Sequence, residues 1–262
     1  MFKKRETELD YFFAALMFYT RIRVPSNAMH SQYVLDRSRK YLPLIGVIIG
    51  SLAAVTFLIA NQVFSTALSI ALSMVLSLLA TGAFHEDGFA DSCDGFGGGW
   101  TKQQVLIIMK DSRLGTYGAA GLVFILAIKF LSLLEIAESN NITLLIAAYV
   151  TAHTISRTLS SFMIDCFDYV QDIDSSKIKP ITEQNLSTND TLFSIATTGL
   201  PIILLASMAP MGTLFACLLS SVTALCFMAY SRHRIGGYTG DVLGATQQLS
   251  EITFYLSLAA SL

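Results

Sequence analysis

The stretch YLPLIGVIIGSLAAVTFLIANQ at residues 41–62, continued by VFSTALSIALSMVLSLLATGAF at 63–84, decides the fold of this chain. Each half supplies the roughly 20 apolar residues that a helix needs to cross about 30 Å of hydrocarbon. Across all 262 residues, 53% are hydrophobic and 14% are charged, and the mean hydropathy is +0.57. Soluble domains carry about 25% charged residues, so the sequence predicts an integral protein of the lipid bilayer.

Further apolar runs of similar length follow, at 115–134, 141–164, 190–208, 210–230 and 242–261. Together with the first two they predict an all-α, polytopic bundle of about seven transmembrane helices. The shorter aromatic segment 9–20 precedes Arg21 and Arg23, so we expect it to lie at the interface or to re-enter. No linker or internal repeat divides residues 1–262, which indicates a single membrane domain.

The basic residues indicate the orientation of the bundle. With the N-terminus inside and seven crossings, 15 of the 17 Lys and Arg residues fall on inside segments, which are 1–40, 85–114, 165–189 and 231–241. This is the asymmetry of the positive-inside rule, so the polar loops are predicted to face the cytoplasm. The polar segment 165–189 is expected to be a mobile loop.

The composition also bounds the partners. The net charge is −2 and no dense basic block occurs, so a nucleic-acid partner is not expected. The four cysteines lack CxxC spacing and a disulfide framework, so neither zinc nor a disulfide is expected. The sequence does not decide the oligomeric state, and a homo-oligomer is one alternative.

The first polar loop opens with FHEDGFADSCDGFGGG at 84–99. Asp87, Asp91 and Asp94 recur at i, i+4 and i+7, a spacing that places all three carboxylates on one face of a helix. Such close like charges repel unless a cation neutralises them. Hard oxygen ligands of this kind suit Mg²⁺ or Mn²⁺. A solvated acidic helix end is the alternative interpretation.

Glycines surround these acids. The glycines of 84–99 are expected to interrupt any regular helix and to offer backbone amides to a phosphate, with Gly97 and Gly98 as candidate substrate-binding residues. A plain turn would use the same glycines.

Two further polar loops fall on the same predicted face. In KDSRLGTYG at 110–118, Lys110 and Arg113 supply the positive charge that phosphate recognition needs, although ordinary flanking charge is the alternative. Asp111 either joins the metal site or pairs with Arg113. In RHRIGGYTGDVLGA at 232–245, Asp241 stands among glycines as a candidate substrate-binding residue, or as a simple helix cap.

Two basic residues fall inside predicted spans. Arg157 lies seven residues from the inner end of the run 141–164, and burying a guanidinium there costs on the order of 3 kcal/mol. We therefore expect Arg157 to face a protein cavity with an anionic partner, and to project towards the acids and bind a substrate phosphate. An Arg that snorkels to the interface is the alternative, and Lys129 is expected to snorkel in this way.

In these motifs the chain resembles the cobalamin synthase family, also called adenosylcobinamide-GDP ribazoletransferase. The match runs through FHEDGFADSCDGFGGG, KDSRLGTYG and GGYTGDVLGA, with weaker similarity at FFAALMFYTRIRVP and RSRKYLPLIGVIIG. The family commonly has an apolar residue where this chain has Glu86, so Glu86 is either a fourth metal ligand or a tolerated variation.

The resemblance implies transfer of the adenosylcobinamide phosphoryl group of adenosylcobinamide-GDP to α-ribazole or its 5′-phosphate, with release of GMP. It implies a bacterial inner-membrane enzyme whose active site faces the cytoplasm. We take Asp91, Asp94 and Asp111 as candidate catalytic residues in a Mg²⁺-dependent reaction, with Asp87 and Glu86 as further candidate ligands.

Two other functions compete with this interpretation. A cation-coupled transporter also places acids beside glycine-broken helices, although here the acids cluster in predicted loops. A CDP-alcohol phosphotransferase-like lipid synthase shares the DxxDG element at Asp91 to Gly95, but the later paired Asp of that signature is absent downstream.

Overall fold

The computed structural model describes residues 6–25, 31–139, 141–170 and 186–262. These residues fold into helices joined by short turns, which confirms the all-α prediction. The helices are α1 (Glu8–Tyr19), α2 (Gln32–Ser38), η1 (Arg39–Tyr41), α3 (Leu42–Ala60), α4 (Thr66–Thr81), α5 (Phe84–Gly98), α6 (Lys102–Met109), α7 (Thr116–Glu138), α8 (Ile142–Cys166), α9 (Thr188–Ala206), α10 (Pro210–Ile235) and α11 (Gly240–Ala259).

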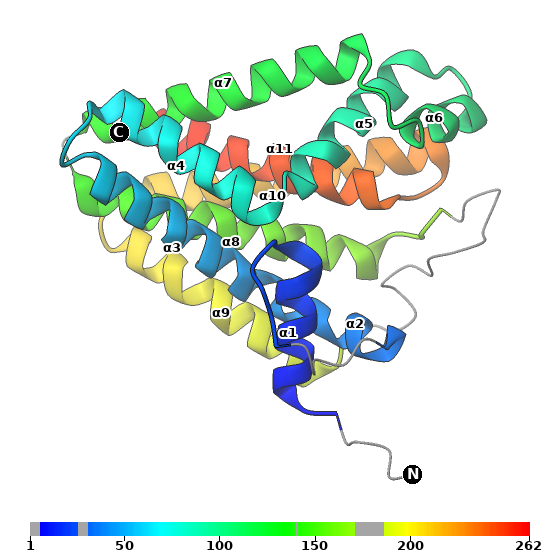
Figure 1. Ribbon diagram of the computed structural model, residues 1–262, viewed down its shortest axis with the longest axis horizontal. Helices are drawn as coiled ribbons and strands as arrows, with labels where there is room; N and C mark the ends of the chain where they lie inside the picture. The colour runs from blue at the N-terminus through cyan, green and yellow to red at the C-terminus, as the bar shows by residue number, and fades with distance from the viewer. Residues whose placement is uncertain (1–5, 26–30, 140, 171–185) are drawn as a thin grey trace.

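The long helices lie side by side along one direction, and α11 runs among them (Figure 1). It contacts α5, α7, α8 and α10, and most of its side chains are buried. The turn between α5 and α6, the start of α7 and the turn between α10 and α11 lie at the same end of the bundle (Figure 1). Of the loop predicted at 165–189, residues 171–185 lie outside the described part of the chain.

The predicted count of seven crossings is not confirmed. Within the described residues, five helices are long and apolar enough to cross a membrane, and six if α4 and α5 count as one bent span. The five are the continuous segment Tyr33–Ala60, which comprises α2, η1 and α3, and the helices α7, α8, α9 and α10. Helix α11 is not among them, because Gln247, Gln248 and Glu251 lower its mean hydropathy. A helix enclosed by other helices does not need an apolar surface.

The chain bends by 89° between α4 and α5. Gly82 and Ala83 both adopt left-handed backbone conformations there, with φ of 68° and 57°. The segment that follows α1 supports this bend, because the Arg21 amide donates to the Ala80 carbonyl at 2.7 Å. Helix α1 coincides with the aromatic segment 9–20 of the sequence.

Helices α3 and α8 approach each other closely through two glycines. A Cβ atom on Gly46 would lie 2.4 Å from the His153 carbonyl oxygen, and one on Gly50 would lie 2.7 Å from that of Tyr149. Small residues permit such contacts between membrane helices. This contact fixes the part of α8 that carries His153 and Arg157 in the interior of the bundle.

Candidate active site

The acid motif lies on α5, as its i, i+4, i+7 spacing predicts. Asp87 is exposed and Asp91 is half-buried. The negative charges of Asp87 and Asp94 lie close enough to repel that of the Asp91 carboxylate. The helix continues through Gly98, so the expectation that the glycines interrupt it is wrong. They serve close packing instead, because a Cβ on Gly97 would lie 2.6 Å from the Tyr117 ring. Gly98 is exposed and has Ile108 as its nearest neighbour.

Asp94 joins the acid motif to the second motif. Its carboxylate accepts hydrogen bonds from the backbone amides of Gly115 at 2.7 Å and Gly118 at 2.8 Å. These amides belong to the first turn of α7, whose own cap residue Gly115 has no side chain to satisfy them. Asp94 therefore replaces the missing cap of α7, and each carboxylate oxygen keeps a further lone pair for another partner.

Asp111 and Arg113 form an exposed pair. The Arg113 Nε lies 3.0 Å from both carboxylate oxygens of Asp111. Hydrogen bonds from Arg113 lower the pKa of Asp111 to about 2, so this carboxylate is ionised at neutral pH. Of the two alternatives for Asp111, the structure shows the pairing with Arg113. Lys110 lies next to this pair in the chain and is exposed.

The third motif packs against the same helix. A Cβ on Gly88 would lie 2.9 Å from the Asp241 backbone, and one on Gly244 would lie 3.2 Å from the His85 carbonyl oxygen. Arg234, at the end of α10, donates to the Gly99 carbonyl oxygen at 2.6 Å. All three sequence motifs are thus brought together around α5.

The donors on α5 fit the chemistry of a divalent cation in part. Asp87, Asp91 and Asp94 present carboxylate oxygens of the kind that Mg²⁺ prefers. Among the described residues, however, no three His, Cys, Asp or Glu side chains are grouped closely enough to form an ion site. Glu86 lies apart from the three, since it is 8% exposed and accepts a hydrogen bond from Gln248 at 2.9 Å inside the bundle. The metal site stays a prediction.

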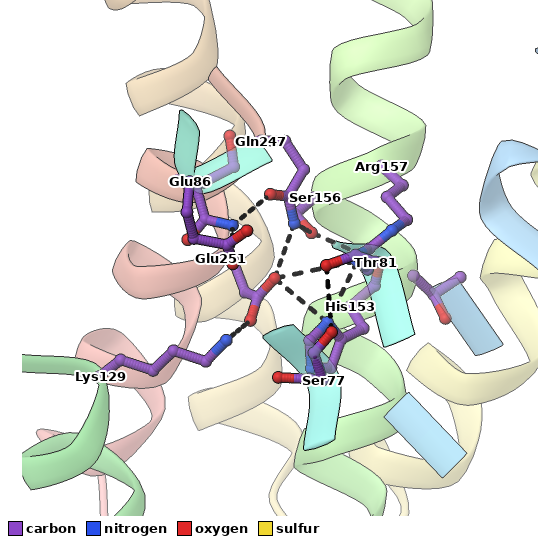
Figure 2. A network of polar contacts seen from close by, with 12 residues as sticks. Ser77, Thr81, Glu86, Lys129, His153, Ser156, Arg157, Gln247 and Glu251 are labelled. Atoms are coloured by element: carbon purple, nitrogen blue, oxygen red, sulfur yellow. Dashed lines mark hydrogen bonds and ion pairs between the residues drawn. The ribbon is translucent and has the colours of Figure 1, made fainter. Parts of the chain in front are cut away.

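A buried polar network occupies the interior beside α5 (Figure 2). Lys129 of α7 forms an ion pair with Glu251 of α11, and the two residues are 5% and 1% exposed. The expectation that Lys129 snorkels is therefore wrong, because a buried carboxylate holds its ammonium group inside the bundle. The Nδ1 atom of His153 lies 3.2 Å from the same carboxylate.

Arg157 belongs to this network. It is 2% exposed, donates to the His153 carbonyl oxygen at 3.0 Å and lies 3.9 Å from Glu251. The expected burial with an anionic partner is confirmed, whereas the expected cavity and the direction towards the acids of α5 stay predictions. That partner is Glu251 of α11, and a role for Arg157 in binding a substrate phosphate stays a prediction.

Sequence reasoning missed the polar residues of α11. Gln247, Gln248 and Glu251 occur inside the run 242–261, which as a whole reads as an apolar span. The signal was their spacing at i, i+1 and i+4, which places Gln247 and Glu251 on one face of a helix. Arg157 and Lys129, each buried in a span, needed an anion of this kind.

The comparisons with known proteins agree with the motifs. The family model described as cobalamin-5-phosphate synthase matches residues 11–259. An adenosylcobinamide-GDP ribazoletransferase of Vibrio cholerae is 42% identical over 97% of this chain and 95% of its own length. Proteins of the same name from Shewanella frigidimarina and Shewanella woodyi are 42% and 41% identical, over 97% and 96% of this chain and 95% and 96% of their own lengths. No solved structure matches the chain. The chain belongs to the cobalamin-5-phosphate synthase family.

Proposed function

We propose that this chain is an adenosylcobinamide-GDP ribazoletransferase. It transfers the adenosylcobinamide phosphoryl group of adenosylcobinamide-GDP to α-ribazole or α-ribazole 5′-phosphate and releases GMP. The observation that carries this proposal is the union of the three polar motifs around α5, in a chain that matches its ribazoletransferase relatives along nearly its whole length.

The reaction needs positioned charges more than covalent help from the protein. A ribose hydroxyl oxygen attacks the phosphorus that carries adenosylcobinamide, the bond from that phosphorus to the bridging oxygen breaks, and GMP leaves with the electron pair. The hydroxyl proton passes to a base, for which Asp91 is our candidate because it is half-buried on the acid face of α5. Lys110 supplies positive charge for the phosphates, and the exposed backbone of Gly97 and Gly98 is our candidate for contacting them.

We further propose that the reaction depends on Mg²⁺ and takes place at the cytoplasmic face of the bacterial inner membrane. Asp87, Asp91 and Asp94 would hold the ion, which would neutralise charge on the diphosphate. The cytoplasmic orientation is supported by the 15 of 17 basic residues on the predicted inside segments.

The test is a transfer assay with the purified chain in detergent, adenosylcobinamide-GDP, α-ribazole 5′-phosphate and Mg²⁺, following GMP and cobamide together. We expect both products in equal amounts and none after chelation of Mg²⁺. Asp91→Asn keeps the shape of the side chain but removes its charge, so kcat should fall by about a hundredfold or more.

The matched control is Glu138→Gln, which changes an exposed carboxylate at the far end of α7. We expect a smaller loss than for Asp91→Asn. Full turnover by Asp91→Asn would place the reaction elsewhere in the molecule. Release of CMP from a CDP-alcohol, or uptake of an unchanged solute into proteoliposomes, would replace the proposed function.

A further inference from the structure

The buried network beside α5 contains a continuous chain of side-chain hydrogen bonds that reaches the acid helix. Gln247 Nε2 donates to Glu251 at 2.6 Å and lies 2.9 Å from the Ser156 hydroxyl oxygen. Gln248 Nε2 then donates to Gln247 at 2.8 Å and to Glu86 at 2.9 Å. The chain therefore runs from the Glu251 carboxylate on α11 to Glu86 on α5 (Figure 2).

Every side chain in this series of hydrogen bonds is buried. Gln247, Gln248 and Glu251 are 0%, 4% and 1% exposed, and Glu86 is 8% exposed. Ionisable residues placed this way inside membrane bundles are costly and are commonly tied to function. Buried ion pairs stabilise a fold poorly compared with apolar residues of similar size. Stability alone is thus a weak reason for Lys129, Arg157 and Glu251 to converge at this point.

The position of α5 against its neighbours depends on several contacts, and the network contributes one of them. The close approach at Gly88 sets the distance between α5 and α11, and Asp94 fixes the far end of α5 against α7. A contact through a glycine backbone does little to hold a helix in one rotation about its own axis. The hydrogen bond from Gln248 to Glu86 does so, because Glu86 directly precedes Asp87 and successive residues of a helix are rotated by about 100°.

We propose that Gln248, supported by Gln247 and Glu251, is a positioning residue for phosphoryl transfer: it holds α5 in the rotation that directs Asp87 and Asp91 to the reactants. This inference rests on the proposed function. Gln248 acts through Glu86 and does not itself touch the reactants. Glu86 accordingly serves as the anchor of the acid helix and not as a ligand of the ion.

The test compares three variants of the full chain in detergent. Gln248→Met keeps the length of the side chain and removes its donors, whereas Gln248→Asn keeps the amide but is too short to reach Glu86. Ser250→Ala is the matched control, since Ser250 lies on the same helix, is 0% exposed and donates only to the Thr246 carbonyl of its own helix. Size-exclusion profiles and thermal unfolding give the folded fraction of each variant.

We expect both Gln248 variants to lower kcat per folded molecule by about 10-fold or more, with KM for adenosylcobinamide-GDP changed by less than about threefold, because electrostatic support of the transition state depends on precise placement. Ser250→Ala should stay within about twofold of the unaltered chain. Should Gln248→Met fail to fold, Gln248→Asn decides. Unchanged kcat in the Gln248 variants would overturn the proposal.

A second readout does not depend on activity. Cys93 lies on α5 and packs against α7, since a Cβ on Gly121 would lie 2.7 Å from its sulfur atom. With Cys166, Cys217 and Cys226 replaced by Ala, the rate of Cys93 alkylation by N-ethylmaleimide reports the rotation of α5. We expect about a threefold change or more in the Gln248 variants and none in Ser250→Ala. If the unaltered chain forms no cobamide, the proposed function fails, and an unchanged Cys93 rate would separately overturn the positioning role.

Discussion

Asp94 differs from the other two acids of its motif. Asp87 is exposed and Asp91 half-buried, but Asp94 is 8% exposed and both of its carboxylate oxygens accept backbone amides of α7. A carboxylate at the start of a helix also interacts favourably with the helix dipole. The sequence spacing predicts the same environment for all three acids. In the structure, Asp94 alone of the three connects the acid motif to the start of α7.

We therefore expect Asp94→Asn to destabilise the protein where Asp91→Asn does not. Asparagine has one acceptor oxygen, so one of the amides of Gly115 and Gly118 loses its partner, at a cost of about 1–3 kcal/mol. Unfolding in mixed micelles measures the free energy of unfolding of both variants. Equal stability of the two would show that α7 does not depend on this cap.

At the scale of elements, the bend between α4 and α5 turns the acid helix away from the apolar run that precedes it. Gly82 ends α4 in the left-handed region, and Ala83 follows in the same region without being glycine. A residue with a Cβ atom pays about 1–2 kcal/mol for this conformation. The bend thus depends on Gly82 and on the Arg21 side chain that packs against it.

Gly82→Ala is expected to lower the free energy of unfolding by more than about 1 kcal/mol. The added Cβ would carry left-handed strain and would lie 2.3 Å from Arg21 Nε. Ala83→Gly is the matched variant, because it removes the same kind of strain and should leave stability equal or slightly higher. Thermal unfolding in one detergent compares the two, and a stable Gly82→Ala protein would mean that α4 and α5 can join without the left-handed turn.

At the scale of the whole molecule, one helix allows the orientation of the bundle to be predicted. Helix α7 has 23 residues, about 34 Å at 1.5 Å a residue, which is enough to cross the hydrocarbon core. Its first turn carries the site loop, and its far end carries Glu135 and Glu138 without any basic residue. The positive-inside rule therefore predicts that the site end faces the cytoplasm.

A labelling experiment tests this orientation. In a chain without its four native cysteines, Glu138→Cys should react with a membrane-impermeant maleimide in intact cells, whereas Gln103→Cys should react only after permeabilisation. Both positions are exposed in the fold, so access from one side decides the result. The reverse pattern would invert the bundle and move the site to the outer face.

The sequence by itself determined the bilayer environment, the helices and the three motifs, because apolar length and helical spacing are local properties. It placed Asp87, Asp91 and Asp94 on one face of a helix, and it indicated that Arg157 needs an anionic partner. These features do not depend on how the helices pack against one another.

Only the tertiary structure decided which partners the polar groups meet. Glu86 and Asp87 are neighbours in the chain, yet one faces the interior and the other is exposed, because the rotation of α5 against α11 separates them. The polar residues of the run 242–261 are tolerated there because α5, α7, α8 and α10 surround the helix. Glu251 can lie in the interior because it forms an ion pair there with Lys129 of α7. These two residues are far apart in the sequence, so their contact depends on how the helices pack and not on a local sequence pattern.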